Sequence, residues 1–465
     1  MAVQGFDVVI IGGGPGGYVC AIRSAQLGLK TAVVERESLG GVCLNWGCIP
    51  TKALLHASDI LSEARHGIGA GLYSGSLSAN LDAVVGHSRQ VAGRLSGGIK
   101  YLMDKNGVAV FTGHGSLAGD MMVEVHSAKG DPVTLHAKSI VIATGAKAGA
   151  PPGFTPDGKR IVTYRGALTP DRLPKSMLVL GGGVIGMEFA SFYNAMGVAV
   201  TVAEMADTIL AGQDADVVAV VRKQAIKRGI KFALGARARI VGQDDDGIDI
   251  VLSQAGKETT SRVEQVLVAT GISAVIDELG LERTKVELSG GRIVTDQYCR
   301  TAEPGVYAIG DVGLPPWLAH KASHEGIVCA EHMAGKAPHP VDPAHIPGCI
   351  FTNPQIASIG LTEAMAAEQG RVVTVGKFPL MANGKALAIG SAEGLVKVIF
   401  ETGTRKLLGA HMVGPEVTEM IQGFAIAIRM GATIDDLTGV VFPHPTVSEA
   451  MHEAVLAADG RALHI

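Results

Sequence analysis

The stretch FDVVIIGGGPGG at residues 6–17 decides the fold of this chain. An apolar, strand-like run leads directly into glycines with the spacing G-x-G-x-x-G, carried by Gly12, Gly14 and Gly17. In such a turn the first glycine permits a tight bend, the second lets the backbone approach a pyrophosphate, and the third lets a helix pack closely on a strand. A helical stretch and a strand ending in Glu35 follow, which completes a βαβ unit.

The same pattern returns as SMLVLGGGVIG at residues 176–186, with its glycines at Gly181, Gly183 and Gly186 and a later strand that leads to Glu204. In each copy the acid stands 18 residues after the third glycine, near the position from which a carboxylate hydrogen-bonds a ribose hydroxyl. A single glycine-rich turn is often only structural. Two complete units, each with its own acid, predict two dinucleotide sites.

The second acid also distinguishes between nicotinamide cofactors. A carboxylate at Glu204 would repel a 2′-phosphate, and the next residues, Met205 and Ala206, offer no arginine to bind one. The second unit is therefore predicted to bind NAD and not NADP.

A second repeated element supports this pairing. Buried runs at 140–145 and 266–271 each end in Ala-Thr-Gly, and each is expected to return the chain to its sheet near a nucleotide. Short β-like stretches at 122–125 and 248–252 lie between the fingerprints and these returns, so we expect a small inserted sheet in each unit.

Length and composition limit the remaining possibilities. The chain has 465 residues, and a prior of roughly 150 residues per domain predicts about three domains. With 47% hydrophobic and 18% charged residues, a compact α/β protein is expected. A formal charge of −4 argues against nucleic acid and anionic membranes as partners. The first strand begins almost at residue 1, which leaves no room for a leader and predicts a cytoplasmic location.

The pattern of predicted strands and helices changes in the later part of the chain. A buried run at 305–310 ends in Asp311, which has the alternative role of a turn or helix cap, and a helix is expected from about 319 to 334. Beyond Pro343, β-like runs alternate with helical stretches, which predicts a separate α+β domain. The expected strands are 394–400 and 407–413, and the expected helices are 416–430 and 448–458.

Two cysteines stand five residues apart in GGVCLNWGCIPTK, residues 40–52. In a regular α-helix the rise alone would separate Cys43 and Cys48 by about 7.5 Å, beyond the roughly 6.8 Å that a disulfide allows between Cα atoms. A disulfide therefore requires an irregular turn, which Gly47 and Pro50 can supply. A helix that starts near them would also favour a thiolate through its N-terminal dipole.

The alternatives for this pair are packing as small apolar groups and metal binding. No C-x-x-C pair and no cluster of histidines stands nearby, so a zinc site is disfavoured and no metal site is predicted. Redox use is the favoured interpretation. The other four cysteines share no spacing and are interpreted as small buried hydrophobes, namely Cys20, Cys299, Cys329 and Cys349.

A histidine near the C-terminus lies between two prolines in FPHPTVSE, residues 442–449. The prolines restrict the backbone around His444, and Glu449 could orient its ring, as a general base requires. A turn that caps the helix beginning near Ser448 is the equal alternative from the residues alone.

Taken together, these motifs resemble the dihydrolipoamide dehydrogenase branch of the glutathione reductase-like flavoproteins, the class I pyridine nucleotide–disulfide oxidoreductases. The resemblance covers essentially the whole chain. It implies an α/β fold with two Rossmann-like domains and a C-terminal α+β dimerisation domain. It is carried by residues 40–55, 181–190, 308–311, 318–322 and 444–449. The predicted boundaries are 1–148 for the FAD-binding domain, 149–273 for the NAD-binding domain, 274–343 for a central domain completing the FAD site, and 344–465 for the dimerisation domain.

The resemblance also implies site residues. Cys43 would exchange with substrate, Cys48 would lie against the flavin, and Lys52 and Glu188 would pair beside the flavin N5. His444, held by Glu449, would be the base, and it would face the cysteines of the other subunit of a homodimer. The residues expected around FAD are Gly12, Gly14, Gly17, Glu35, Lys52, Gly115, Thr144, Gly145, Asp311 and Ala319, and those expected around NAD are Gly181, Gly183, Gly186, Glu188, Glu204 and Gly271.

The implied activity is oxidation of protein-bound dihydrolipoyl groups with reduction of NAD to NADH, as a shared component of 2-oxoacid dehydrogenase or glycine cleavage complexes. The implied partners are lipoyl domains and an acyltransferase core, and the implied role includes cell redox homeostasis. The chain departs from the family pattern at Val42, where Thr is common, at Ile272-Ser273, where Arg is usual, and at His324, where an acid is frequent. The missing Arg bears on contacts with NAD.

Other flavoproteins of this fold fit less well. A glutathione- or trypanothione-type reductase should carry basic residues for NADP near Glu204, and mercuric reductase should carry a C-terminal cysteine pair, whereas the last cysteine here is Cys349. A transhydrogenase would lack the cysteines. A non-catalytic flavoprotein subunit would tolerate the loss of His444 or one cysteine, and neither is lost.

Overall fold

The computed structural model describes residues 3–128 and 130–465. These residues form two compact units. Each unit holds one of the two glycine fingerprints. The first unit comprises the chain up to Leu54, Asp82–Gly149 and Gly271–Val341, and the second comprises Leu55–Leu81, Ala150–Thr270 and Asp342–Ile465. The bounds of the four domains expected from the sequence stay a prediction.

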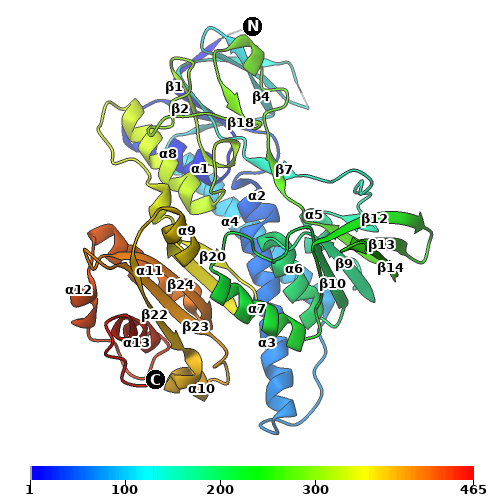
Figure 1. Ribbon diagram of the computed structural model, residues 1–465. Helices are drawn as coiled ribbons and strands as arrows, with labels where there is room; N and C mark the ends of the chain where they lie inside the picture. Colours follow the sequence, from blue (N-terminus) through cyan, green and yellow to red (C-terminus); the bar gives the residue numbers. More distant parts are fainter. Residues whose placement is uncertain (1–2, 129) are drawn as a thin grey trace. The chain divides into compact units, whose positions relative to one another are not determined.

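The first unit is built on one mixed sheet with the order β3-β2-β1-β6-β5-β4, and β19 pairs with β6. Strands β1, β2 and β4 of this sheet are labelled in Figure 1. The strands β3, β2, β1, β6 and β19 run parallel. Strand β5 pairs antiparallel with the first half of β6, and β4 pairs antiparallel with β5. The insertion expected here is therefore fused to the main sheet. The strands are β1 (Gln4–Ile11), β2 (Thr31–Glu35), β3 (Ala109–Thr112), β4 (His114–Gly119), β5 (Met122–His126), β6 (Val133–Ile142) and β19 (Val306–Ala308).

Helices α1 (Pro15–Gln26) and α8 (Ala319–Met333) lie side by side in this unit (Figure 1). Their backbones approach closely because both helices carry glycine at the contact. A Cβ atom on Gly326 would lie 2.6 Å from the Gly16 carbonyl oxygen. The unit also holds α2 (Gly41–Trp46), the start of α3 (Cys48–Gly69), α4 (Leu81–Lys105) and the short antiparallel pair β7 (Ala146–Ala148) and β16 (Ile272–Ala274).

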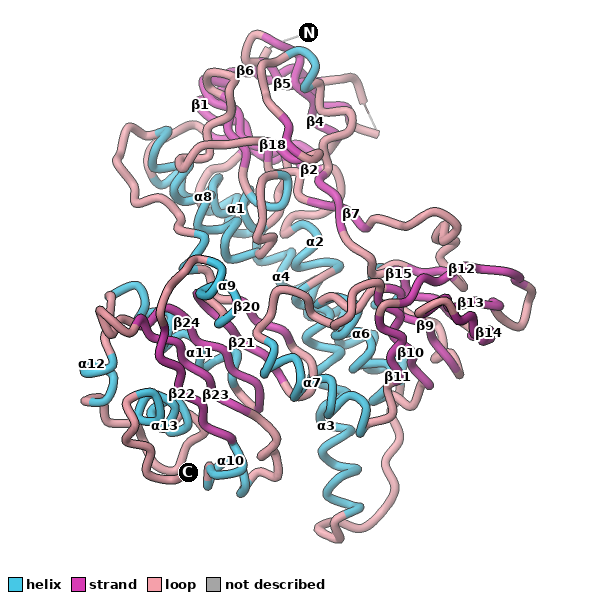
Figure 2. Tube along the Cα trace, in the orientation of Figure 1, coloured by secondary structure: helices cyan, strands magenta, loops and turns pink. Residues whose placement is uncertain are grey.

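The second unit contains a parallel sheet with the order β11-β10-β9-β15-β8, which carries the second fingerprint. Here the expected insertion is a separate antiparallel sheet, β12-β13-β14 (Figure 2). The elements are β8 (Ile161–Val162), α5 (Tyr164–Leu168), β9 (Ser176–Leu180), α6 (Val184–Ala195), β10 (Ala199–Glu204), α7 (Ala215–Lys227), β11 (Lys231–Leu234), β12 (Ala236–Gln243), β13 (Ile248–Gln254), β14 (Lys257–Val263) and β15 (Gln265–Val268).

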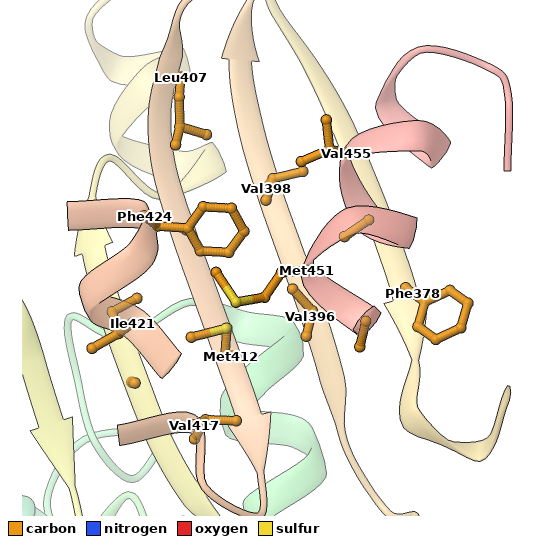
Figure 3. Packing of buried hydrophobic residues seen from close by; sticks show 14 of the residues in the cluster. Phe378, Val396, Val398, Leu407, Met412, Val417, Ile421, Phe424, Met451 and Val455 are labelled. Carbon is orange, nitrogen blue, oxygen red and sulfur yellow. The ribbon is translucent and has the colours of Figure 1, made fainter. Parts of the chain in front are cut away.

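The C-terminal part of this unit is an antiparallel sheet, β20-β21-β24-β23-β22, packed against helices. Side chains of the strands and of α11 and α13 meet in one buried cluster, seen in Figure 3 around Met412, Phe424 and Met451. The α+β prediction is confirmed, and each of the four expected elements is present within a residue of its predicted bounds. They are β23 (Leu395–Glu401), β24 (Leu407–Gly414), α11 (Val417–Met430) and α13 (Glu449–Ala458), accompanied by β20 (Gly348–Ile350), β21 (Gln355–Gly360), α9 (Glu363–Glu368), β22 (Val373–Pro379), α10 (Gly384–Ala388) and α12 (Ile434–Thr438).

One buried cation joins this sheet to α7. Lys397 on β23 is 1% exposed, and its Nζ lies 2.8 Å from Asp214 and 2.7 Å from Asp216, at the start of α7. A buried ammonium without partners would lower the stability of the fold by roughly several kcal/mol. These carboxylates are therefore required for Lys397 to be buried. None of the described helices combines the length and apolar character needed to cross a membrane.

The contact between β22 and α13 depends on a glycine. A Cβ atom at Gly376 would lie 2.0 Å from the Ala454 carbonyl oxygen, so we expect Gly376→Ala to lower the free energy of unfolding by about 1–3 kcal/mol through overpacking. Gly384→Ala is the matched control, because nothing lies within 4 Å of its Cβ position. Urea denaturation measures both variants. Equal stability of the two would contradict this account of the contact.

Candidate active site

The first fingerprint forms a turn in which backbone atoms nearly touch. Gly12 has φ +107°, and a Cβ on it would lie 2.3 Å from the Ala143 carbonyl oxygen. A Cβ on Gly17 would lie 1.9 Å from the Gly12 carbonyl oxygen. No side chain fits at either position, which confirms the physical roles expected of the first and third glycines.

The second fingerprint repeats this geometry closely. Gly181 has φ +109°, and its Cβ would lie 2.4 Å from the Ala269 carbonyl oxygen. A Cβ on Gly186 would lie 2.0 Å from the Gly181 carbonyl oxygen. The Ala-Thr-Gly segments thus lie against the turns in both units, as the sequence predicted.

The two acids are bound to their turns in the same way. In the first unit Glu35 accepts hydrogen bonds from the N–H groups of Gly13 at 2.7 Å and Glu37 at 2.7 Å. In the second unit Glu204 accepts from Gly182 at 2.7 Å and Ala206 at 2.8 Å. A carboxylate oxygen has two lone pairs, so each acid keeps acceptor capacity for a ribose hydroxyl.

The helices that follow the turns fit an anionic ligand. The N-caps of α1 and α6 are Gly14 and Gly183, neither helix start has a side-chain cap, and neither has an acid in its first turn. Their first N–H groups and the positive end of the helix dipole are thus left for a negatively charged group. Both turns therefore fit the pyrophosphate of a dinucleotide such as FAD or NAD.

The two cysteines flank a break between two helices. Cys43 lies inside α2, which ends at Trp46, and Cys48 begins α3. Gly47 between them has φ −140° and ψ −114°, outside the helical region, which is the irregular turn that the spacing required. The N-terminus of α3 favours negative charge on the Cys48 sulfur.

Helix α4 fixes this cysteine loop from outside. Ser88 donates to the Pro50 carbonyl oxygen at 3.0 Å, and Arg89 donates to the Asn45 carbonyl oxygen at 2.6 Å. The Arg89 guanidinium also lies 4.4 Å from the ring centroid of Trp46. Sequence reasoning did not find these residues, because α4 is distant in the chain and its polar residues form no motif.

Charges and burial make the two sulfurs unequal. Both cysteines are thiols in this structure. A hydrogen bond with Cys48, followed by burial, raises the pKa of Cys43 far above its ordinary value, while Lys52 acts in the opposite direction. Burial, and then the nearby Cys43, raises the pKa of Tyr18. The start of α3 makes Cys48 the better place for a thiolate.

Asp311 lies close enough to act electrostatically on Cys43. Burial raises the pKa of Asp311 to about 6, with Lys321 opposing this shift and Glu325 adding to it. Lys321 pairs with Glu325 at 2.8 Å, and the other oxygen of Glu325 accepts from the Gly310 N–H at 2.7 Å. Glu325 thus faces the turn before Asp311.

Glu188 lies on α6, five residues after the N-cap glycine of the second fingerprint. Its side chain is 4% exposed, and its carboxylate accepts a hydrogen bond from the Phe351 N–H at 3.0 Å. A buried carboxylate needs such donors to keep its charge. The expected pairing of Glu188 with Lys52 stays a prediction.

His444 and Glu449 form the pair that the sequence suggested. The His444 Nδ1 lies 2.9 Å from Glu449 Oε1, and Glu449 Oε2 accepts from the Thr446 N–H at 2.9 Å. Burial acts to raise the pKa of Glu449, but the Thr446 N–H and the His444 ring lower it overall. Because Glu449 is ionised, Nδ1 carries the hydrogen and the Nε2 lone pair is available to a proton.

The structure also shows the surroundings of the other residues expected to contact FAD or NAD. Gly115 is on β4, where an added Cβ would lie 3.1 Å from Val34, and Ala319 begins α8. Thr144 donates to the Val275 carbonyl oxygen at 2.7 Å. Gly145 and Gly271 both have positive φ, at +70° and +143°. Their contacts with FAD or NAD stay predictions. Among the described residues no cluster of three or more His, Cys, Asp or Glu could hold a metal ion.

Two nucleotide turns, a cysteine pair at a helix break and a histidine–carboxylate pair define a dinucleotide-dependent disulfide oxidoreductase as the class. The sequence matches the family described as pyridine nucleotide-disulphide oxidoreductase over residues 6–326. It matches the dimerisation domain of the same family over residues 346–455. The chain therefore belongs to the pyridine nucleotide-disulphide oxidoreductase family, whose members use FAD and NAD, and it carries the domain through which they form homodimers.

Similar proteins cover the full chain. A dihydrolipoyl dehydrogenase of Rhizobium etli is 50% identical, and one of Zymomonas mobilis is 48% identical, each over 99% of both chains. Among solved structures, LpdA of Mycobacterium tuberculosis superposes with a TM-score of 0.90 at 27% identity, over 97% of this chain and 99% of that one. The fold class and the family inferred from the motifs are confirmed.

The raised pKa of Asp311 predicts a pH-dependent stability in the FAD-free protein. A carboxyl whose pKa is raised on folding to about 6 favours the folded state below pH 4 or so, and this contribution is lost as the pH rises through about 6. We therefore expect Asp311→Asn to raise the free energy of unfolding by about 1–2 kcal/mol at pH 8 and by almost nothing at pH 4. Urea denaturation at the two pH values measures this. The account would be contradicted if Asp311→Asn were less stable than the wild type by an amount that grows with pH.

Proposed function

We propose that this protein is a dihydrolipoyl dehydrogenase, which oxidises protein-bound dihydrolipoyl groups to lipoyl groups and reduces NAD to NADH. The observation that carries the proposal is the Cys43–Cys48 pair at the break between α2 and α3, in the same unit as the first nucleotide turn. The names of full-length relatives at 48–50% identity support the substrate.

The chemistry of the cysteines follows from their unequal sulfurs. With the pair oxidised, a substrate thiolate attacks the Cys43 sulfur, and Cys48 leaves as the thiolate that the start of α3 favours. The second substrate thiol then attacks the first substrate sulfur, which is bonded to Cys43 in the mixed disulfide. The substrate leaves as a cyclic disulfide, and Cys43 receives the proton of the second thiol and leaves as a thiol. FAD, when bound, takes the electron pair from the dithiol and delivers it as hydride to NAD.

His444 is proposed as the base in the dithiol half of the reaction. Its Nδ1–H donates to Glu449, which leaves Nε2 to take the proton from the substrate thiol. The His444 side chain is 79% exposed in the single chain, which agrees with a role at an interface. We propose that it acts on the cysteines of the other subunit, so that each site is complete only in the homodimer.

The second unit is proposed to bind NAD rather than NADP. Both oxygens of Glu204 accept backbone hydrogen bonds, so its negative charge stays fixed beside the turn. A 2′-phosphate would meet this charge without an arginine to offset it. This disfavours a glutathione-type reductase, the second candidate of the same fold.

The finer parts of the proposal concern partners and place. Lipoyl domains and the acyltransferase core of a 2-oxoacid dehydrogenase complex, or the corresponding glycine cleavage component, would deliver the substrate. A cytoplasmic location is supported by the cysteine chemistry, because a reducing compartment keeps unpaired thiols free except where a disulfide is catalytic.

The cysteine mechanism is tested with Cys48→Ser. Wild-type protein should reduce NAD, and not NADP, with dihydrolipoamide as donor. Cys48→Ser should abolish this reaction but keep bound FAD, because Cys48 begins α3 and takes no part in the glycine turn. The visible absorbance of the flavin measures retained FAD, and the ultraviolet absorbance of NADH measures NAD reduction. Full turnover by the variant would reject the mechanism.

The role of the histidine is tested with His444→Gln. Glutamine can keep a hydrogen bond to Glu449 but cannot take a proton, so dithiol oxidation should slow by about 10²–10⁴-fold. The flavin spectrum and flavin reduction by NADH should be unchanged. Rapid mixing with dihydrolipoamide measures the dithiol half-reaction, and an unaltered rate there would show that His444 is not the base.

A further inference from the structure

The buried carboxylate of Glu188 depends on a turn that is distant in the chain. Its oxygen accepts from the Phe351 N–H at 3.0 Å, and Phe351 directly follows β20. Because Glu188 is 4% exposed, water cannot replace this donor readily, and a shift of the turn would move the carboxylate or break this hydrogen bond. The geometry of the turn is therefore part of the geometry of Glu188.

The turn between β20 and β21 is held on both of its sides. The hydroxyl of Thr352, which is 2% exposed, donates to the Pro354 carbonyl oxygen at 2.7 Å. The Asn353 Nδ2 donates to Asp59 Oδ1 at 2.9 Å, and the Asn353 Oδ1 accepts from Arg228 Nη2 at 2.5 Å. The first contact shapes the turn internally, whereas the other two fasten it to neighbouring helices.

Asn353 matches its two partners by charge. Its amide donates toward a carboxylate and accepts from a guanidinium, so a flipped amide would place like groups together at both ends. Asp59 lies on α3, and Arg228 is the residue that ends α7. Burial raises the pKa of Asp59, and the hydrogen bond from Asn353, followed by Arg228, works against that shift. The three side chains form one line of complementary contacts.

We infer that Asn353 is a positioning residue for hydride transfer, because by bridging Asp59 and Arg228 it holds the Phe351 N–H on Glu188. This inference rests on the proposed function and on the role in hydride transfer that the resemblance to the family implies for Glu188. Asn353 itself acts only through the turn and is not a catalytic residue. Its loss should affect the exchange of hydride with NAD and leave the dithiol chemistry of Cys43 and Cys48 intact.

The test measures the two half-reactions separately by rapid mixing of the holoenzyme. In Asn353→Ala, flavin reduction by NADH should slow by about 10-fold, since roughly one charge-assisted hydrogen bond is lost on each side of the turn. The deuterium isotope effect with 4-deuterated NADH should increase, because hydride transfer becomes more limiting. Flavin reduction by dihydrolipoamide should stay within about twofold of the wild type.

Three further variants separate positioning from general stability. Lys227→Ala removes the neighbouring exposed pair with Glu393, at 3.2 Å, and should leave both half-reactions unchanged. The double variant Asp59→Asn, Asn353→Asp exchanges donor and acceptor and keeps the same total charge. It should recover most of the NADH rate, whereas Asn353→Asp alone, which sets two carboxylates against each other, should not.

Specific outcomes would overturn the inference. They are an NADH rate for Asn353→Ala within twofold of the wild type, an equal loss in both half-reactions, or no recovery in the double variant. A failure of the proposed function looks different, because wild-type protein would then exchange hydride with NADH but show no flavin reduction by dihydrolipoamide.

Discussion

The close approach of backbone to backbone in the glycine turns is the constraint on which the rest of the protein depends. At Gly17 and Gly186 a single added carbon would lie 1.9 and 2.0 Å from a carbonyl oxygen. Only this approach brings the start of a helix against the end of its strand, with uncapped N–H groups facing outward. The two units use the same solution, which explains how one chain can offer two similar nucleotide sites.

Four carboxylates with expected functions accept a hydrogen bond from a backbone N–H. The distances are 2.7 Å for Glu35, 2.7 Å for Glu204, 3.0 Å for Glu188 and 2.9 Å for Glu449. Backbone donors lie on rigid elements and lose little conformational freedom when they bind, so they fix both the charge and the position of an acid. The partner of such an acid, whether a ribose hydroxyl or the His444 ring, then meets a prepared acceptor.

Local chemistry could be predicted wherever the interacting residues lie close together in the sequence. The glycine spacing, the acids 18 residues later, the cysteines separated by Gly47 and the His444–Glu449 spacing all act within a few turns of chain. For that reason the fold class, the βαβ units, the α+β domain and the histidine–carboxylate pair were accessible from sequence. The separate form of the second insertion and the fused form of the first were not, because strand pairing between β5 and β6 depends on register and not on composition.

By itself, then, the sequence determined the nucleotide turns, the break that makes a disulfide possible and the family to which they belong. Only the tertiary structure decided that α4 holds the cysteine loop through Ser88 and Arg89. It also decided that Asn353 bridges Asp59 and Arg228, 294 and 125 residues away. The reason is physical: a hydrogen bond between distant residues leaves no period or spacing in the chain, and it exists only after packing has brought its donor and acceptor together.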